Sequence, residues 1–199
     1  MTKQSLGLRE RNRLRTRDEI LVAMSVLLGE RSYESITIDD VAQHAGVSRG
    51  TIYTYFPDGR DQLVRDAYLR IAEIVASDGA DRREAQTDIT ERILGLTTAL
   101  VDVAITPEGR FYGMIGSALF GPLGGVTGTA SSSFRTMLAE DLRAAVREGL
   151  VSRNLMVDET VVLLGGALRE IGATAAREPD RAPQLLQALR ATCRTLFDS

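Results

Sequence analysis

Residues 37–56 read Thr-Ile-Asp-Asp-Val-Ala-Gln-His-Ala-Gly-Val-Ser-Arg-Gly-Thr-Ile-Tyr-Thr-Tyr-Phe. Thr37 is suited to cap the start of a short helix, and Asp40 three residues later supplies a carboxylate at the positive end of that helix. Gly46 follows where the helix must stop, because glycine enters the left-handed conformation of a tight turn without a steric penalty. Ser48 is then placed to cap a second helix. Two short helices joined by a turn that contains glycine predict a helix-turn-helix unit.

The second helix of such a unit lies in the major groove of DNA and presents its first residues to base edges. Ile52 and Phe56 are four residues apart and should pack on the core, which leaves the other side chains outward. Arg49 can donate two hydrogen bonds to a guanine or a phosphate, and Thr51 can offer a hydroxyl and a methyl group to a base edge. Gly50 would let the backbone approach the DNA closely.

Tyr53 and Tyr55 carry hydroxyls that can reach phosphates. The alternative is that two short amphipathic helices around a glycine belong to a helical protein that binds no DNA, in which case both tyrosines only support packing. His44, the one histidine of the chain, lies inside the same unit. It is interpreted as a structural or phosphate-facing residue and not as a catalytic base.

Charge is distributed unevenly along the chain, whose formal net charge is −3. Residues 1–17 carry six basic side chains and one acidic one, a balance of +5, so the remaining residues sum to −8. A basic arm on an acidic body suits contact with a polyanion through one end only, although a solvated tail has the same composition. Arginines at every second position of residues 9–17 would share one side of an extended arm that enters a minor groove. We therefore expect an arm that is flexible when free and ordered on DNA.

The rest of the chain repeats apolar residues at helical spacing and offers no convincing alternation of the kind that strands show. The sequence predicts an all-α protein of about nine helices, with a first helix of about 15 residues from Asp18. Turns are expected at residues 77–79, 106–107, 121–128 and 178–180, and the glycine-rich and serine-rich stretch 121–133 is expected to be a mobile loop.

Composition excludes several other classes of protein. One cysteine and one histidine leave no intrachain disulfide and argue against a zinc site built from these residues within one chain, so no metal and no cofactor are expected. No apolar run approaches the ~20 residues of a membrane span, and no signal peptide is evident, which favours a cytoplasmic protein without a membrane partner. No nucleophile, base and acid combine without His44, and no phosphate-binding loop precedes a lysine, which argues against an enzyme.

The run from Thr37 to Phe56, with the flanking residues 13–69, resembles the DNA-binding signature of the tetracycline-repressor (TetR) family. The resemblance implies a three-helix head over residues 1–60, a helical ligand-binding and dimerisation domain over residues 61–199, and a homodimer formed by the last two helices. It implies a regulator, by default a repressor, that binds a palindromic DNA operator and is released by a small molecule. The residues expected at the DNA are Thr37, Gln43, Ser48, Arg49, Gly50, Thr51, Tyr53, Thr54 and Tyr55.

One segment departs from the pattern of the family. The family commonly shows Phe, two further residues and then Lys, whereas this chain reads Phe56-Pro57-Asp58-Gly59-Arg60. This looks like an insertion of one residue, with Arg60 in place of the lysine that meets a phosphate. Arg60 is therefore added to the expected DNA contacts.

The body carries no motif that identifies a ligand. Residues 111–120 are aromatic and contain Met and Gly, which suits either a pocket wall or ordinary core. The candidate effector contacts are Phe111, Met114, Ile115, Phe120, Arg135 and Leu168. Charged residues that could orient a polar end, or could simply be solvated or paired, are Asp102, Arg110, Arg135, Arg169 and Glu170. Few polar candidates favour a largely apolar small molecule.

The last two helices combine leucines with Gly165, Gly166 and Gly172, and small residues there suit the close helix approach of a dimer seam or of an intramolecular core. Cys193 is interpreted as a buried apolar residue, with a redox sensor as the alternative. A DNA-binding architectural protein without a ligand and an activator remain alternatives to a ligand-released repressor.

Overall fold

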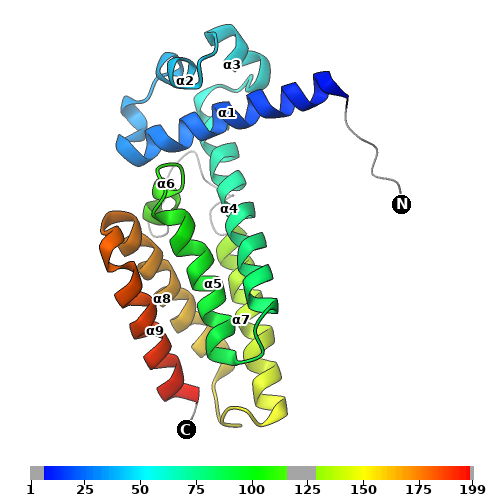
Figure 1. The fold of residues 1–199 in the computed structure, drawn as a ribbon, viewed down its shortest axis with the longest axis vertical. Helices are drawn as coiled ribbons and strands as arrows, with labels where there is room; N and C mark the ends of the chain where they lie inside the picture. Colours follow the sequence, from blue (N-terminus) through cyan, green and yellow to red (C-terminus); the bar gives the residue numbers. More distant parts are fainter. Residues whose placement is uncertain (1–6, 116–128, 198–199) are drawn as a thin grey trace.

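The computed structural model describes residues 7–115 and 129–197, and these residues form nine α-helices without strands (Figure 1). The predicted all-α fold is confirmed. Within the described ranges, no helix is both long enough and apolar enough to cross a membrane. The helices are α1 (Leu8–Glu30), α2 (Ile38–Ala45), α3 (Arg49–Tyr55), α4 (Arg60–Glu84), α5 (Ile89–Ala104), α6 (Arg110–Ile115), α7 (Thr129–Glu148), α8 (Val157–Arg177) and α9 (Ala182–Phe197).

The first three helices form a head that sits across one end of the molecule, and α4 runs from this head along the body formed by α5 to α9 (Figure 1). The apolar residues of α1, α2 and α3 converge under the head, because each short helix can bury only one face. Fully buried side chains there include Ile20, Met24, Ile36, Val41, Ile52 and Phe56. A division of the chain at residue 60 stays a prediction, since α4 begins there and continues without interruption.

The N-terminal arginines lie in α1 and not in an extended arm, so that expectation is wrong for residues 8–17. The helix has 23 residues where about 15 were expected. Its added turns carry little apolar surface, and i,i+4 pairing helps them, as between Arg15 and Glu19 at 3.5 Å. Arg17 of α1 contacts other elements: it pairs with Asp66 of α4 at 2.7 Å and lies over the ring of Phe56.

The turn expected at residues 77–79 does not exist, because α4 continues through them to Glu84. Gly79 serves packing at this position. A Cβ atom there would lie 2.8 Å from the ring of Phe134 and 3.3 Å from Leu96. Glycine at this position lets α5 and α7 approach α4 closely. A residue that the sequence suggests as a helix breaker therefore serves close packing within the helix.

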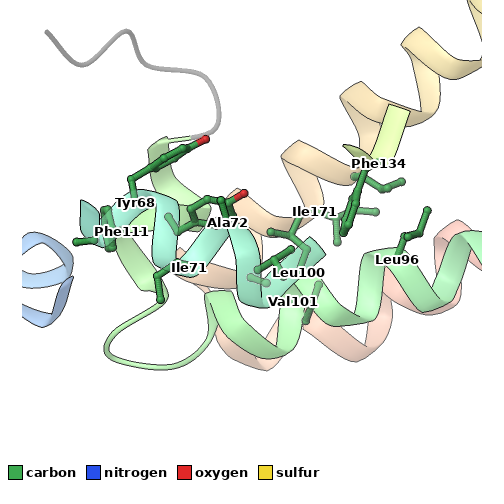
Figure 2. Packing of buried hydrophobic residues seen from close by; sticks show 14 of the residues in the cluster. Tyr68, Ile71, Ala72, Leu96, Leu100, Val101, Phe111, Phe134 and Ile171 are labelled. Atoms are coloured by element: carbon green, nitrogen blue, oxygen red, sulfur yellow. The ribbon is translucent and has the colours of Figure 1, made fainter. Parts of the chain in front are cut away.

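The helices of the body pack around one apolar interior (Figure 2). Phe134 of α7 reaches toward Leu96 and Leu100 of α5, and Tyr68 and Ile71 of α4 lie near Phe111 of α6 (Figure 2). Turns occur at 106–107 and around 178–180 as predicted. The loop expected over 121–133 is wrong for its last residues, because 129–133 belong to α7, and residues 121–128 lie outside the described residues.

A buried ion-pair cluster joins three helices at the end of the body away from the head. The Asp141 carboxylate, whose side chain is 4% exposed, accepts two hydrogen bonds of 2.7 Å from Arg83 and lies 2.7 Å from Arg92. Burial alone would raise the pKa of Asp141, but the hydrogen bonds and charges of Arg83 and Arg92 outweigh it and lower that pKa. The carboxylate is therefore ionised at neutral pH and links α7 to α4 and α5.

Candidate nucleic-acid interface

The start of α2 has the capping box that the sequence predicts. The Thr37 hydroxyl accepts a hydrogen bond from the backbone N–H of Asp40 at 3.1 Å, and the Asp40 carboxylate accepts one from the backbone N–H of Thr37 at 2.8 Å. The Thr37 hydroxyl also donates to the Asp40 carboxylate at 2.6 Å, and this bond, followed by the one from the Thr37 backbone N–H, lowers the pKa of Asp40. Gly46 ends the helix with φ at +66°, as expected. The geometry holds α2 at a fixed angle to the helix that follows.

The start of α3 is capped by Ser48, whose hydroxyl accepts from the backbone N–H of Thr51 at 3.0 Å. Ile52 and Phe56 are fully buried and anchor the helix on the core. Most of the residues expected at DNA are consequently left on the solvent side. The exposed ones are Thr37, Gln43, Ser48, Arg49, Gly50, Tyr53 and Thr54, while Thr51 and Tyr55 are half-buried.

Arg49 is preorganised by two neighbours. Its guanidinium lies 3.0 Å from the carboxylate of Asp39 and 5.7 Å from the centre of the Tyr53 ring. The charge of Asp39 raises the pKa of Arg49. Sequence reasoning missed Asp39, because its partner is ten residues away on the other helix of the unit and only the turn brings the two together.

Arg60 is engaged by the protein itself. Its guanidinium stacks on Tyr33 at 4.1 Å and donates to the carbonyls of Ile36, Tyr33 and Glu34 at 3.0, 3.4 and 3.5 Å. These carbonyls belong to the loop that enters α2. The arrangement fixes the head on α4, and a phosphate contact by Arg60 stays a prediction.

The insertion before α4 is accommodated by Gly59. This residue has φ at +70°, where a side chain would be strained, and its N–H donates to the carbonyl of Phe56 at 3.0 Å. The Phe56 ring can therefore stay buried while the chain reverses into α4. The extra residue relative to the family pattern is thus accommodated in a hydrogen-bonded turn at the base of the head.

A second set of contacts joins the head to the body. Arg70 of α4 bonds to Asp18 of α1 and to Glu108, 3.3 Å away in the turn before α6. Gly29 of α1 packs against Pro107 of the same turn, since a Cβ atom at Gly29 would lie 3.1 Å from the Pro107 carbonyl oxygen. A shift of α6 would therefore change the contacts of this turn with α1 and with α4 together.

The body contains a cavity of about 50 Å³ between α4, α5, α6, α7 and α8. Of the candidate effector residues, Arg135 and Leu168 line it. Phe111 is buried in the core and Met114 is half-buried, and neither lines the cavity. The side chain of Ile115 and all of Phe120 lie outside the described part of the chain. The described residues that line the cavity are Tyr68, Val75, Leu100, Tyr112, Gly113, Phe134, Arg135, Gly165, Leu168 and Arg169.

Cys193 is fully buried, as the sequence predicts, and burial raises the pKa of its thiol to about 11. The thiolate that would react with an oxidant is thereby disfavoured.

A capped two-helix unit with an exposed, arginine-bearing second helix on an all-helical body defines the helix-turn-helix class of protein. Residues 20–67 match the family model for bacterial regulatory proteins of the tetR family. The match covers the head of the chain and the start of α4, and this part of the chain is therefore similar to the tetR family of regulatory proteins.

Curated relatives share the head. An uncharacterized HTH-type transcriptional regulator of Mycobacterium tuberculosis is 37% identical over 86 residues, which cover 43% of this chain and 40% of that protein. The HTH-type transcriptional regulator AlkX of the same species is 44% identical over 64 residues, covering 32% and 30%. The matched part of this chain thus spans about two fifths of these relatives' length or less.

Solved structures share the fold over nearly the whole chain. The fatty acid degradation regulator FadR of Bacillus halodurans aligns with a TM-score of 0.73 at 16% identity, covering 94% of this chain and 96% of that one. The TetR family protein CprB of S. coelicolor aligns with a TM-score of 0.71 at 23% identity, covering 92% and 89%. At such identities the likeness extends to the arrangement of helices.

Proposed function

We propose that this protein is a transcriptional regulator that binds a palindromic DNA operator as a homodimer, acts as a repressor, and is released by a small molecule. The observation that supports this most directly is the face of α3, where capping and burial leave Arg49, Tyr53 and Thr54 exposed beside a helix N-terminus. Arginine and hydroxyl groups in this position suit base edges and phosphates. The tetR-family match covers the same residues.

Release by a ligand would work through the cavity in the body. At about 50 Å³ it holds a few water molecules, whereas sites for drug-sized ligands measure about 300–1,000 Å³. An effector would have to part the helices around the cavity, so it would favour a second conformation. Tyr112 and Gly113 of α6 line the cavity, and the turn before α6 contacts α1 and α4 through Pro107 and Glu108.

The test of the proposed function is a fluorescence-anisotropy titration of the protein against duplexes from its own promoter region and against random duplexes, at two salt concentrations. A regulator should bind one promoter duplex at least ~1,000-fold more tightly than random DNA, and binding should weaken as salt rises. Binding no tighter than that to random DNA, by folded protein, would contradict the proposal.

The homodimer is proposed to form through α8 and α9. Leu163 on α8 is 73% exposed, and Leu196 on α9 is 45% exposed. Gly166 and Ala188 are small residues on these two helices, which suits close helix packing. A group of exposed large apolar side chains on neighbouring helices suits contact with a partner chain.

Replacing Leu163 with arginine should convert the dimer into a folded monomer, because a charge would be buried in the seam of each protomer. Sedimentation velocity should show a dimer dissociation constant at least ~100-fold higher than that of the wild type. Leu150→Arg is the matched control, since Leu150 is 59% exposed in the turn after α7 and should leave the dimer intact. An unchanged dimer in Leu163→Arg would place the interface elsewhere.

Replacing Asp39 with asparagine should lower sequence discrimination. The exposed pair with Arg49 contributes little energy, so affinity for random DNA should rise about threefold as the repulsion of phosphates by Asp39 disappears. Affinity for the operator should rise less, because Arg49 loses the partner that orients it. Parallel anisotropy titrations with operator and random duplexes measure the ratio of the two affinities.

The control for Asp39→Asn is Glu30→Gln, which makes the same charge change at the exposed end of α1. An affinity ratio in Asp39→Asn equal to that of the wild type would mean that Asp39 does not orient Arg49 on DNA.

A further inference from the structure

The charged residues that the sequence offers as candidates for orienting a ligand fall into two groups. Asp102 pairs with Arg82 at 2.8 Å, Glu170 pairs with Arg177 at 3.3 Å, and Arg110 donates to the carbonyl of Ala176 at 3.0 Å. Arg135 and Arg169 behave differently. Across the residues that the structure describes, neither guanidinium has an ion pair or a hydrogen bond, and both line the cavity.

The two arginines flank the cavity from neighbouring helices. Arg135 comes from α7 and its side chain crosses α8 at Gly165, where a Cβ atom would lie 3.6 Å from the Arg135 Cγ. Arg169 comes from α8, and a Cβ atom at Gly166 would lie 3.9 Å from its guanidinium. Both side chains are exposed. The cations therefore stand at the mouth of the cavity, where their charge remains solvated without a ligand.

Among the described residues that line the cavity, none carries a carboxylate. The carboxylates nearby on α7 and α8 are held by other arginines: Glu140 and Asp141 by Arg83, and Asp158 by Arg143. The interior wall is apolar, with Leu100, Leu168 and Phe134 among its side chains. Tyr112 lies there too, and burial followed by the neighbouring Tyr68 raises its pKa, so its hydroxyl stays neutral.

We propose that the effector of this protein is an amphipathic anion, an organic acid whose carboxylate lies between Arg135 and Arg169 and whose apolar part enters the cavity. The inference rests on the proposed function and names the ligand class of its sensor. Two unpaired guanidinium groups supply charge-assisted donors for a carboxylate. The described interior wall supplies no second charge beyond the two arginines, which argues against dianions and zwitterions with both ends buried.

The experiment compares octanoate with octanol, which share an apolar chain and differ in charge. Isothermal titration of the DNA-free protein at pH 7.5 should show octanoate binding at least about tenfold more tightly than octanol, because only the acid gains hydrogen bonds to charged groups. In Arg135→Gln with Arg169→Gln, octanoate affinity should fall to that of octanol, whose own affinity should not change.

Arg147→Gln is the matched control, because Arg147 is exposed on α7 beyond the cavity and its replacement should leave octanoate binding intact. Equal affinity of the wild type for acid and alcohol, loss of octanoate binding in the control as well, or no octanoate binding at all would each overturn the ligand class. The operator titration without any acid tests the regulator separately, so specific DNA binding with no octanoate binding would reject this inference alone.

Discussion

Replacing Arg49 and Tyr53 together with alanine is expected to weaken operator binding about 100-fold or more. Each good contact to a base edge is worth about 1–3 kcal/mol, and a dimer would lose the contacts of two heads at once. Both residues are exposed on α3, so the variant should fold with a stability within about 0.5 kcal/mol of the wild type. Anisotropy titration against the operator gives the affinity, and circular dichroism verifies the fold.

The control for this variant is Arg153→Ala, in the turn between α7 and α8 at the end of the body opposite the head (Figure 1). Its operator affinity should equal that of the wild type. Loss of a single good base contact already lowers the affinity by more than about threefold. If the operator affinity of the double variant is within about threefold of the wild type, α3 does not lie on the DNA.

The single variant Arg49→Ala separates two forms of contact. Loss of a phosphate contact would reduce the slope of log affinity against log salt by about one per contact and weaken binding to all sequences alike. Loss of a guanine contact would leave that slope unchanged and relax the preference for one base pair. The outcome assigns the contact.

Replacing Asp141 with asparagine is expected to lower the free energy of unfolding by about 3 kcal/mol, because Arg83 and Arg92 would be left unpaired in a largely buried setting. The side chains of these arginines are 12% and 24% exposed, which places the loss at the low end for buried pairs. The melting temperature should fall by roughly 6–12 °C for a protein of this size. Thermal denaturation at equal protein concentration measures the change.

Glu140→Gln is the matched control for Asp141. Glu140 also bonds to Arg83, at 3.2 Å, but it is 59% exposed, so its loss should cost less than about 1 kcal/mol. Since the pKa of Asp141 is lowered in the folded protein, its contribution is present at neutral pH and is lost as pH falls through that pKa. The difference in the free energy of unfolding between the wild type and Asp141→Asn should therefore narrow below about pH 4. If this difference in the free energy of unfolding stays constant as the pH falls, the ion pair is not its source.

The local chemistry of the head could be predicted from the sequence. The cap at Thr37, the left-handed Gly46, the cap at Ser48 and the burial of Ile52 all depend on residues within four positions of each other, and all are confirmed. Such short-range hydrogen bonds are encoded in spacing alone. The contact assignments on DNA are still predictions.

Features that depend on long-range packing could not be predicted. The turn expected at Gly79 does not form, because the glycine leaves space for Phe134, which lies 55 residues later in the chain. Tyr68 and Tyr112 meet in the cavity, with ring centres 5.0 Å apart, only because α4 packs on α6. The extent of α1 was underestimated, because residues 8–17 show no apolar period even though their side chains are compatible with a helix.

The uninterrupted length of α4 makes it a lever. Its 25 residues extend about 37 Å at 1.5 Å per residue, with the ion-pair cluster near one end and the head at the other. A tilt of about 5° around the cluster would displace the head by about 3 Å, close to the 3.4 Å that separates successive base pairs. A small rotation of α4 in the body would thus become a displacement of the head comparable to the spacing of base pairs. The ion pair between Arg83 and Asp141 would be the fixed point of that rotation.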